Sequence, residues 1–249
     1  MQLVTFDRKI YFDTAKPMFG SYNQEQVDGQ EFLLAGWEKH PASEDLRHFA
    51  YMLATTKHET ASTMMPIEEY GKGSGAEYGK KDPKTGHAYY GRGFVQLTWA
   101  DNYKKATTEL GLEDGDDLYL HADQALDPII ACQIMFKGME EGWFRKSKDG
   151  KAQTLIRYFS ATRDDPYEAR EIINGDKTKV PTWSNGVSIG NLIKGYHQKF
   201  LVALQKSAIL VPSEPEPELP LEPVDPEERV VSVVITAPPG VRVDVQIVQ

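Results

Sequence analysis

A stretch of alternating proline and acidic residues, from Val211 to Glu228, sets the strongest limit on how this chain can fold. A segment of this composition cannot bury apolar area and favours the extended polyproline II conformation. It therefore separates the residues that must supply a globular core from a short C-terminal segment. We expect a domain over residues 1–211, a semi-rigid Pro/Glu-rich linker over residues 212–228 and a tail over residues 229–249.

The tail contains two β-branched stretches, residues 230–236 and 241–248, joined by a turn that holds two prolines and a glycine. This pattern predicts a β-hairpin. Because an isolated hairpin is only marginally stable in water, its strands should dock on the domain, pair with a second copy of the chain or bind a protein partner by strand addition.

Residues 1–211 are expected to be mainly α-helical with long loops. Helical spacing of apolar residues predicts helices over residues 26–37, 46–60, 102–110, 128–141, 152–159, 166–173 and 189–206. The second of these should begin at a cap provided by Asp45 or Ser43 and bury a stripe formed by Leu46, Phe49, Ala50 and Leu53. Seven glycines between residues 71 and 93 predict a long irregular loop, and such loops in compact domains are usually functional.

The charge of the chain argues against a nucleic acid as partner. Residues 212–249 hold eight acids against two arginines, so −6 of the net charge of −9 belongs to them and only −3 to residues 1–211. Binding to phosphates requires clustered lysines and arginines, which a nearly neutral domain without a basic stripe does not offer.

The apolar segments predict a protein that does not insert stably into a membrane. No run approaches the roughly 20 apolar residues of a membrane span, and the N-terminus lacks the apolar region of a secretory signal. We expect synthesis in the cytoplasm and access to an external substrate through a membrane pore. The single cysteine, Cys132, lies in the apolar run 129–135 and is expected to be a core residue without a disulfide.

Two glutamates have the placement that cleavage of a glycosidic bond needs. The reaction requires one carboxyl group that keeps its proton and a second carboxylate that activates water or attacks the sugar. Glu59 lies in the last turn of the helix predicted over residues 46–60, and Glu69 follows the helix-breaking Pro66. Glu68 and Glu77 are alternatives for the second carboxylate.

A metal site is not expected. His58-Glu59 resembles the start of a helical zinc motif, but that motif needs a second histidine four residues after the first, where this chain has Ser62. With six histidines and one cysteine in the whole chain, we predict neither a metal nor another cofactor.

The segment from Tyr89 to Trp99 combines aromatic rings, two glycines, a cation and hydrogen-bonding side chains within eleven residues. Sugar clefts use such groups for stacking and orientation. A strand with a glycine turn would explain residues 94–97, but not why Arg92 stands between two glycines. Tyr90 and Trp99 could stack on sugar rings or belong to the core.

Taken together, these segments resemble the glycoside hydrolase family 19 chitinases and their endolysin relatives from bacteriophages and prophages. The resemblance spans residues 20–205 and rests on His58-Glu59-Thr60, Glu69-Tyr70-Gly71, residues 89–99 with Asn102-Tyr103, and Ile172-Ile173-Asn174-Gly175. It implies a mainly α, lysozyme-like two-lobed fold. Plant members have disulfides and a longer insertion between the two glutamates, whereas the nine residues between Glu59 and Glu69 resemble the bacterial and phage members.

The resemblance also implies the roles of the site residues. Glu59 matches the general acid, and Glu69 best matches the general base that activates water in an inverting reaction, with Thr98 beside the water. Inversion requires about 6.5–9.5 Å between the two carboxyl groups. Glu59 must hold its proton near neutral pH, which needs partial burial or a neighbouring carboxylate. We expect Arg92 to favour the charged state of Glu69. The substrate contacts implied or suggested by these motifs are His58, Tyr90, Arg92, Gln96, Thr98, Asn102 and Asn174.

The expected substrate is the glycan of peptidoglycan, as for an endolysin, because the chain lacks a secretory signal and has the short form of the family. Chitin has the same β-1,4 linkage and N-acetylglucosamine unit, so a chitinase is an alternative. A lytic transglycosylase, which needs one catalytic acid and forms an anhydro product, is another. The alternative outside enzymes is a sugar-binding or particle-assembly protein that keeps the cleft without catalysis.

Overall fold

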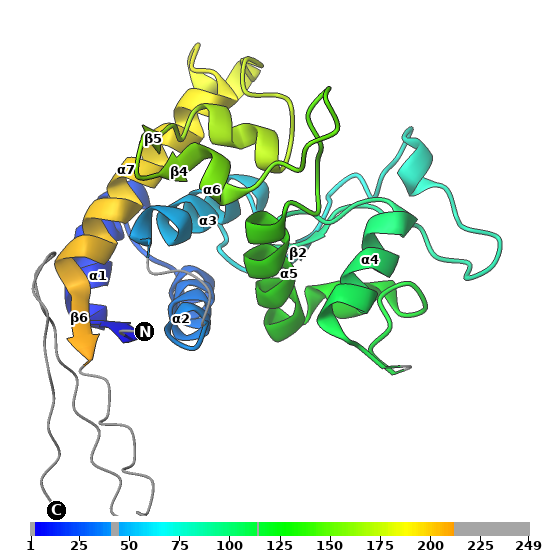
Figure 1. Ribbon diagram of the computed structural model, residues 1–249, viewed down its shortest axis with the longest axis horizontal. Helices are drawn as coiled ribbons and strands as arrows, with labels where there is room; N and C mark the ends of the chain where they lie inside the picture. Colours follow the sequence, from blue (N-terminus) through cyan, green and yellow to red (C-terminus); the bar gives the residue numbers. More distant parts are fainter. Residues whose placement is uncertain (1–2, 41–44, 114, 212–249) are drawn as a thin grey trace, which may run out of the picture. The chain divides into compact units, whose positions relative to one another are not determined.

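The computed structural model describes residues 3–40, 45–113 and 115–211. The chain divides into two units, Met1–Pro212 and Ser213–Gln249. The linker predicted over residues 212–228 and the hairpin predicted over residues 229–249 lie outside the described residues. The first unit is mainly helical, as the sequence predicts (Figure 1).

The described elements are α-helices and 3-10 turns with a few very short strands. The α-helices are α1 Arg8–Ala15, α2 Gln24–Glu38, α3 Leu46–Glu59, α4 Ala100–Leu110, α5 Pro128–Glu141, α6 Leu155–Tyr158 and α7 Ile189–Ser207. The 3-10 helices are η1 Lys16–Met18, η2 Glu77–Gly79, η3 Ala122–Leu126, η4 Glu168–Ile172 and η5 Thr182–Ser184. The strands form three antiparallel pairs: β1 Leu3–Phe6 with β6 Ala208–Val211, β2 Ile67–Glu68 with β3 Arg92–Gly93, and β4 Phe159–Ser160 with β5 Arg163–Asp164.

Helix α3 forms the centre of the unit. The side chain of Asp45 caps it by accepting a hydrogen bond from the backbone N–H of Arg47, and every residue from His48 to Lys57 is buried. Burial is therefore wider than the predicted stripe, because α7 covers one side of α3 while α2 and α5 contact others. Glu59 ends this rigid helix, so its backbone is fixed by the core.

The helices with clear end signals agree closely with the prediction. Helix α5 begins at Pro128 behind Asp127, whose carboxylate accepts hydrogen bonds from the N–H groups of Ile129 and Ile130, and it stops at Gly142 with a left-handed backbone. Helix α2 begins two residues earlier than predicted, because Asn23 and Gln26 form a reciprocal capping box.

Two predicted helices are mostly not α-helical. The segment 152–159 contains only one helical turn, α6, after which Phe159 turns extended and pairs in β4. The segment 166–173 contains the 3-10 helix η4. Both segments are too short for helical hydrogen bonds alone to fix the backbone conformation. The packing of their buried side chains therefore determines it.

The pairing of β1 with β6 was not predicted, nor was α1. Leu3 pairs with Val211 and Phe6 with Ala208, so strands from opposite ends of the unit form one two-stranded sheet. Each strand has four residues, which is too short for a recognisable alternation.

Cys132 is a buried free thiol, and burial raises its pKa to about 12. This confirms its predicted place in the core. Among the residues that the structure describes, no helix is both long and apolar enough to cross a membrane.

Lys57 is a buried lysine that has no acidic partner within the described residues. Its Nζ donates a hydrogen bond to Ser62 Oγ at 3.0 Å and lies 4.0 Å from the centre of the Phe19 ring. Burial, with a smaller contribution from Lys199, lowers the pKa of Lys57 to about 8 from the usual 10.5. The unfolded chain therefore binds this proton more tightly than the folded protein does.

Lys57→Met is expected to raise the free energy of unfolding at pH 7 by about 1–2 kcal/mol, because it removes a charge that is buried at a cost. In the wild type, this cost disappears as pH rises from about 8 to 10.5, so the two proteins should approach equal stability in that range. Urea unfolding at pH 7 and pH 9.5 measures the difference. Lys194→Met, at an exposed lysine of α7, is the control, and equal pH dependence of the two variants would contradict the prediction.

Candidate active site

A cleft of about 550 Å³ brings together six of the nine site residues predicted from the sequence. They are Glu59, Glu69, Gln96, Thr98, Asn102 and Asn174. Three aromatic residues, Tyr78, Trp99 and Phe144, also line it, together with Arg145 and several apolar residues. The cleft thus has the two carboxylates, amides and rings that a sugar polymer would require.

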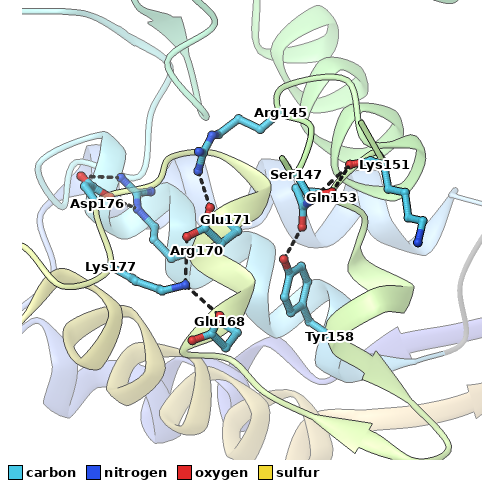
Figure 2. Close-up of polar contacts among 10 residues, drawn as sticks. All are labelled: Arg145, Ser147, Lys151, Gln153, Tyr158, Glu168, Arg170, Glu171, Asp176 and Lys177. Atoms are coloured by element: carbon cyan, nitrogen blue, oxygen red, sulfur yellow. Dashed lines mark hydrogen bonds and ion pairs between the residues drawn. The ribbon is translucent and has the colours of Figure 1, made fainter. Parts of the chain in front are cut away.

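Glu59 enters the cleft from the end of α3 and is held by a buried arginine. Its side chain is 14% exposed, and its Oε1 accepts a hydrogen bond from Nη1 of Arg170. Arg170, in η4, is only 2% exposed. It also binds Asp176, with 2.7 Å from Nε to Oδ1 and 3.3 Å from Nη2 to Oδ2 (Figure 2).

The three groups form a charged cluster. Burial opposes the charge of Arg170, but the carboxylates of Glu59 and Asp176 outweigh burial and raise the pKa of Arg170. Burial would likewise raise the pKa of Asp176, but the hydrogen bond and charge of Arg170 reverse this effect and lower it. With all three ionised, one cation faces two carboxylates, so the cluster carries one net negative charge.

Glu69 is positioned by the pairing of β2 with β3. Its backbone N–H donates to the carbonyl of Gly91 at 2.7 Å, and its Oε2 accepts from the N–H of Gly91 at 3.1 Å. The hydroxyl of Tyr78 donates to Oε1 at 3.1 Å. A Cβ atom at Gly91 would lie 2.6 Å from Oε1 of Gln96, so this close approach requires glycine.

The two alternatives for the second carboxylate lie outside the cleft lining. Glu68 accepts a hydrogen bond from Tyr90 Oη at 2.5 Å and pairs with Lys72 at 2.9 Å, and these contacts lower the pKa of Glu68. Glu77 is exposed and pairs with Lys80 at 2.6 Å. The geometry therefore brings Glu69, and neither Glu68 nor Glu77, into the cleft with Glu59.

Arg92 was expected to contact substrate in the cleft, but it lies outside the cleft lining. It is buried, its Nε donates to Asp123 at 3.0 Å, and its Nη1 donates to Tyr103 Oη at 3.1 Å. Its guanidinium also lies 3.8 Å from the centre of the Tyr90 ring. Arg92 is therefore engaged with Asp123, Tyr103 and Tyr90 and does not line the cleft, so the expectation that it contacts substrate and favours the charged state of Glu69 is corrected.

His58 and Tyr90 also lie outside the cleft lining. Tyr90 is buried by the contacts with Glu68 and Arg92, so its ring belongs to the core. His58 is partly buried with its ring 6.3 Å from that of Trp183, and burial lowers the pKa of His58. Trp99, in contrast, is 51% exposed and lines the cleft, with its ring edge-on to Tyr78 at 5.4 Å.

The amide side chains of the cleft also shape its wall. Nε2 of Gln96 donates to the carbonyls of Ile67 at 3.0 Å and Gly93 at 3.3 Å, which ties β2 to the turn after β3. Nδ2 of Asn102 donates to the carbonyl of Thr98 at 2.8 Å. Asn174 is exposed at the cleft, directly after η4 and Ile173.

Sequence reasoning missed Arg170 and Asp176, although a signal was present. Both flank the Ile172-Ile173-Asn174-Gly175 motif, so charged neighbours of that motif were reasonable candidates. Tyr78 lies within the glycine-rich segment 71–93, which the sequence marked as functional without singling out this residue, whereas Arg145 lies outside every motif and carried no signal. Within residues 3–40, 45–113 and 115–211, no three or more His, Cys, Asp or Glu side chains are grouped to hold a metal ion.

Comparison with known proteins supports the fold. No family model and no curated protein matches the sequence. A solved chitinase C variant superposes with a TM-score of 0.50 at 19% identity, over 78% of this chain and 76% of that chain. Chitinase C from Streptomyces griseus HUT6037 gives 0.49 at 21% identity, over 78% and 92%. A bacterial family 19 chitinase gives 0.46 at 21%, over 77% and 93%. The superposition on the chitinase C variant shows that the chain has its helical, lysozyme-like fold.

Proposed function

We propose that this chain is a glycoside hydrolase of the family 19 type that cleaves β-1,4 bonds next to N-acetylated amino sugars. The observation that carries the proposal is the presence of Glu59 and Glu69 in the lining of one cleft, each held by hydrogen bonds to protein groups. Glycoside hydrolysis requires two carboxyl groups that play different parts, and the surroundings of these two differ accordingly.

Glu59 is the proposed general acid. Arg170 holds the orientation of its carboxyl group but divides its positive charge between Glu59 and Asp176. In this role the carboxyl group of Glu59 gives a proton to the leaving oxygen of the glycosidic bond.

Glu69 is the proposed general base. Tyr78 and the N–H of Gly91 donate hydrogen bonds to its two oxygens and so fix the orientation of the carboxyl group in the cleft. In this role it takes a proton from a water molecule beside Thr98, and that water attacks the anomeric carbon from the face opposite the leaving group. The product then has the inverted anomeric configuration.

Peptidoglycan is the proposed substrate, as for an endolysin. The nine residues between Glu59 and Glu69 fit this substrate, since the short form resembles the bacterial and phage members of the family, and the phage members are endolysins. Chitin is the second candidate, because the solved structures that resemble this chain are named chitinases.

Product analysis tests the proposal. The protein is incubated with purified peptidoglycan and, separately, with an N-acetylglucosamine hexamer, and new reducing ends are measured. We expect hydrolysed ends on peptidoglycan, with the α-anomer formed first in proton NMR spectra. Anhydro ends in the mass spectrum would identify a lytic transglycosylase, exclusive cleavage of the hexamer would identify a chitinase, and no cleavage of either would reject the enzymatic proposal.

A further inference from the structure

Arg145 is the one cationic side chain in the lining of the cleft as the described residues form it. The inference that follows rests on the proposed function. Glu59 and Glu69 also line the cleft, so an anionic polymer entering it would meet two carboxylates. A cation on the wall that also holds Phe144 and Asn174 can offset that repulsion at one position along the chain of sugars.

The guanidinium of Arg145 is held in a defined place. Nη1 donates to Oε2 of Glu171 at 2.7 Å, and Figure 2 shows the side chain reaching from its loop to Glu171 in η4. A Cβ atom at Gly175 would lie 2.7 Å from Nη2 and 2.8 Å from Nη1. Gly175 therefore leaves the space in which the guanidinium lies, and a side chain there would push it out.

Glu171 only partly neutralises the positive charge of Arg145, because it also pairs with a second cation. Its other oxygen, Oε1, accepts from Nζ of Lys177 at 2.9 Å, and Lys177 also binds Glu168 at 2.8 Å (Figure 2). Glu171 thus faces two cations. Nε and Nη2 of Arg145 donate to no group in the described part of the chain, and the side chain is 34% exposed.

We propose that Arg145 is a specificity-determining residue that binds a carboxylate carried by the substrate and so favours anionic N-acetylated amino-sugar polymers over neutral ones. Nε and Nη2 form one edge of the guanidinium, which matches the two oxygens of a carboxylate. Peptidoglycan presents such groups in the lactyl substituents and peptides of alternate sugars, and chitin presents none. Arg145 would therefore make the cleft bind peptidoglycan more tightly than chitin.

Carboxymethyl chitin and glycol chitin test this proposal, because they share a backbone and differ in charge. We expect the wild type to prefer the anionic polymer. Arg145→Met should lower the ratio of kcat/KM on carboxymethyl chitin to that on glycol chitin about tenfold, mainly through KM, as for the loss of one charge-assisted contact. Added salt should raise KM of the wild type on the anionic polymer more than that of the variant.

Arg163→Met is the matched control, because it removes an arginine that pairs with one carboxylate, Asp165, but lies outside the cleft lining. Its preference ratio should equal that of the wild type. An unchanged ratio in Arg145→Met, or an equal fall in both variants, would overturn the proposal. Arg145→Lys, which keeps the charge without the planar fork, should retain part of the preference.

Affinity electrophoresis separates this inference from the proposed function. If the wild type cleaves neither peptidoglycan nor either of these polymers, the proposed function fails, but its retardation in gels that contain each polymer still reports binding. Greater retardation by carboxymethyl chitin than by glycol chitin, lost in Arg145→Met, would uphold the role of Arg145. Equal retardation of wild type and variant in both gels would reject it.

Discussion

Glu59→Gln is expected to lower kcat/KM for the polymer about 10³-fold, because the amide has no proton to give to the leaving oxygen. The amide has the size of the carboxyl group, and its oxygen can still accept the hydrogen bond from Arg170. Arg170 also keeps both bonds to Asp176. The melting temperature should therefore change little while turnover is lost. Reducing-end assays and thermal unfolding of the same preparation measure the two effects.

Glu38→Gln is a close control for this variant. Glu38 accepts hydrogen bonds from Arg8 at 2.6 and 2.8 Å, and Arg8 binds a second carboxylate, Glu31, so the cluster repeats the arrangement around Arg170 outside the cleft. Its activity should stay within about twofold of the wild type, since it does not touch the cleft. Substantial activity in Glu59→Gln would remove Glu59 from the mechanism.

Glu69→Gln is expected to lower kcat about 10²- to 10³-fold, because the amide cannot take a proton from water. The hydroxyl of Tyr78 can still donate to the amide oxygen, and the pairing of β2 with β3 does not depend on the charge. Substrate binding should therefore persist, and KM should change much less than kcat. Steady-state kinetics on a soluble polymer separates the two constants.

The matching variant of the adjacent residue, Glu68→Gln, tests which of the two glutamates is the second catalytic carboxylate. Glu68 also accepts a hydrogen bond from a tyrosine, Tyr90, but it lies outside the cleft lining. Glu68→Gln should lose some stability through its contacts with Tyr90 and Lys72, yet keep most of its kcat. If Glu68→Gln lost more kcat than Glu69→Gln, Glu68 would be the second catalytic carboxylate.

Features with a local cause could be predicted from the sequence. Helix α5 has its predicted bounds because an Asp-Pro start and a glycine stop act within a few residues of the helix ends. The cleft position of Glu59 also follows from local signals, since the helix periodicity places it in the last turn of α3. Four of the seven substrate contacts predicted from the motifs line the cleft as well: Gln96, Thr98, Asn102 and Asn174.

Features set by distant contacts could not be predicted. Arg92 and Arg170 each have a glycine and an aromatic residue nearby in the sequence, but the contacts of η4 with α6 and α7 bring only the guanidinium of Arg170 to Glu59. The pairing of β1 with β6 joins residues about two hundred positions apart, and neither strand contains a sign of its partner. The same holds for the 3-10 backbone of η4, which follows from the contacts of Arg170 and Ala169 in the core.

The register of β1 with β6 has a further consequence for handling this unit. Leu3 lies opposite Val211, so the two ends of the folded unit are adjacent strand positions. A short glycine linker could join them, and the chain could be reopened at an exposed turn such as that around Gly150. Such a circular permutant would carry Glu59 and Glu69 on a backbone with new termini and leave the cleft intact.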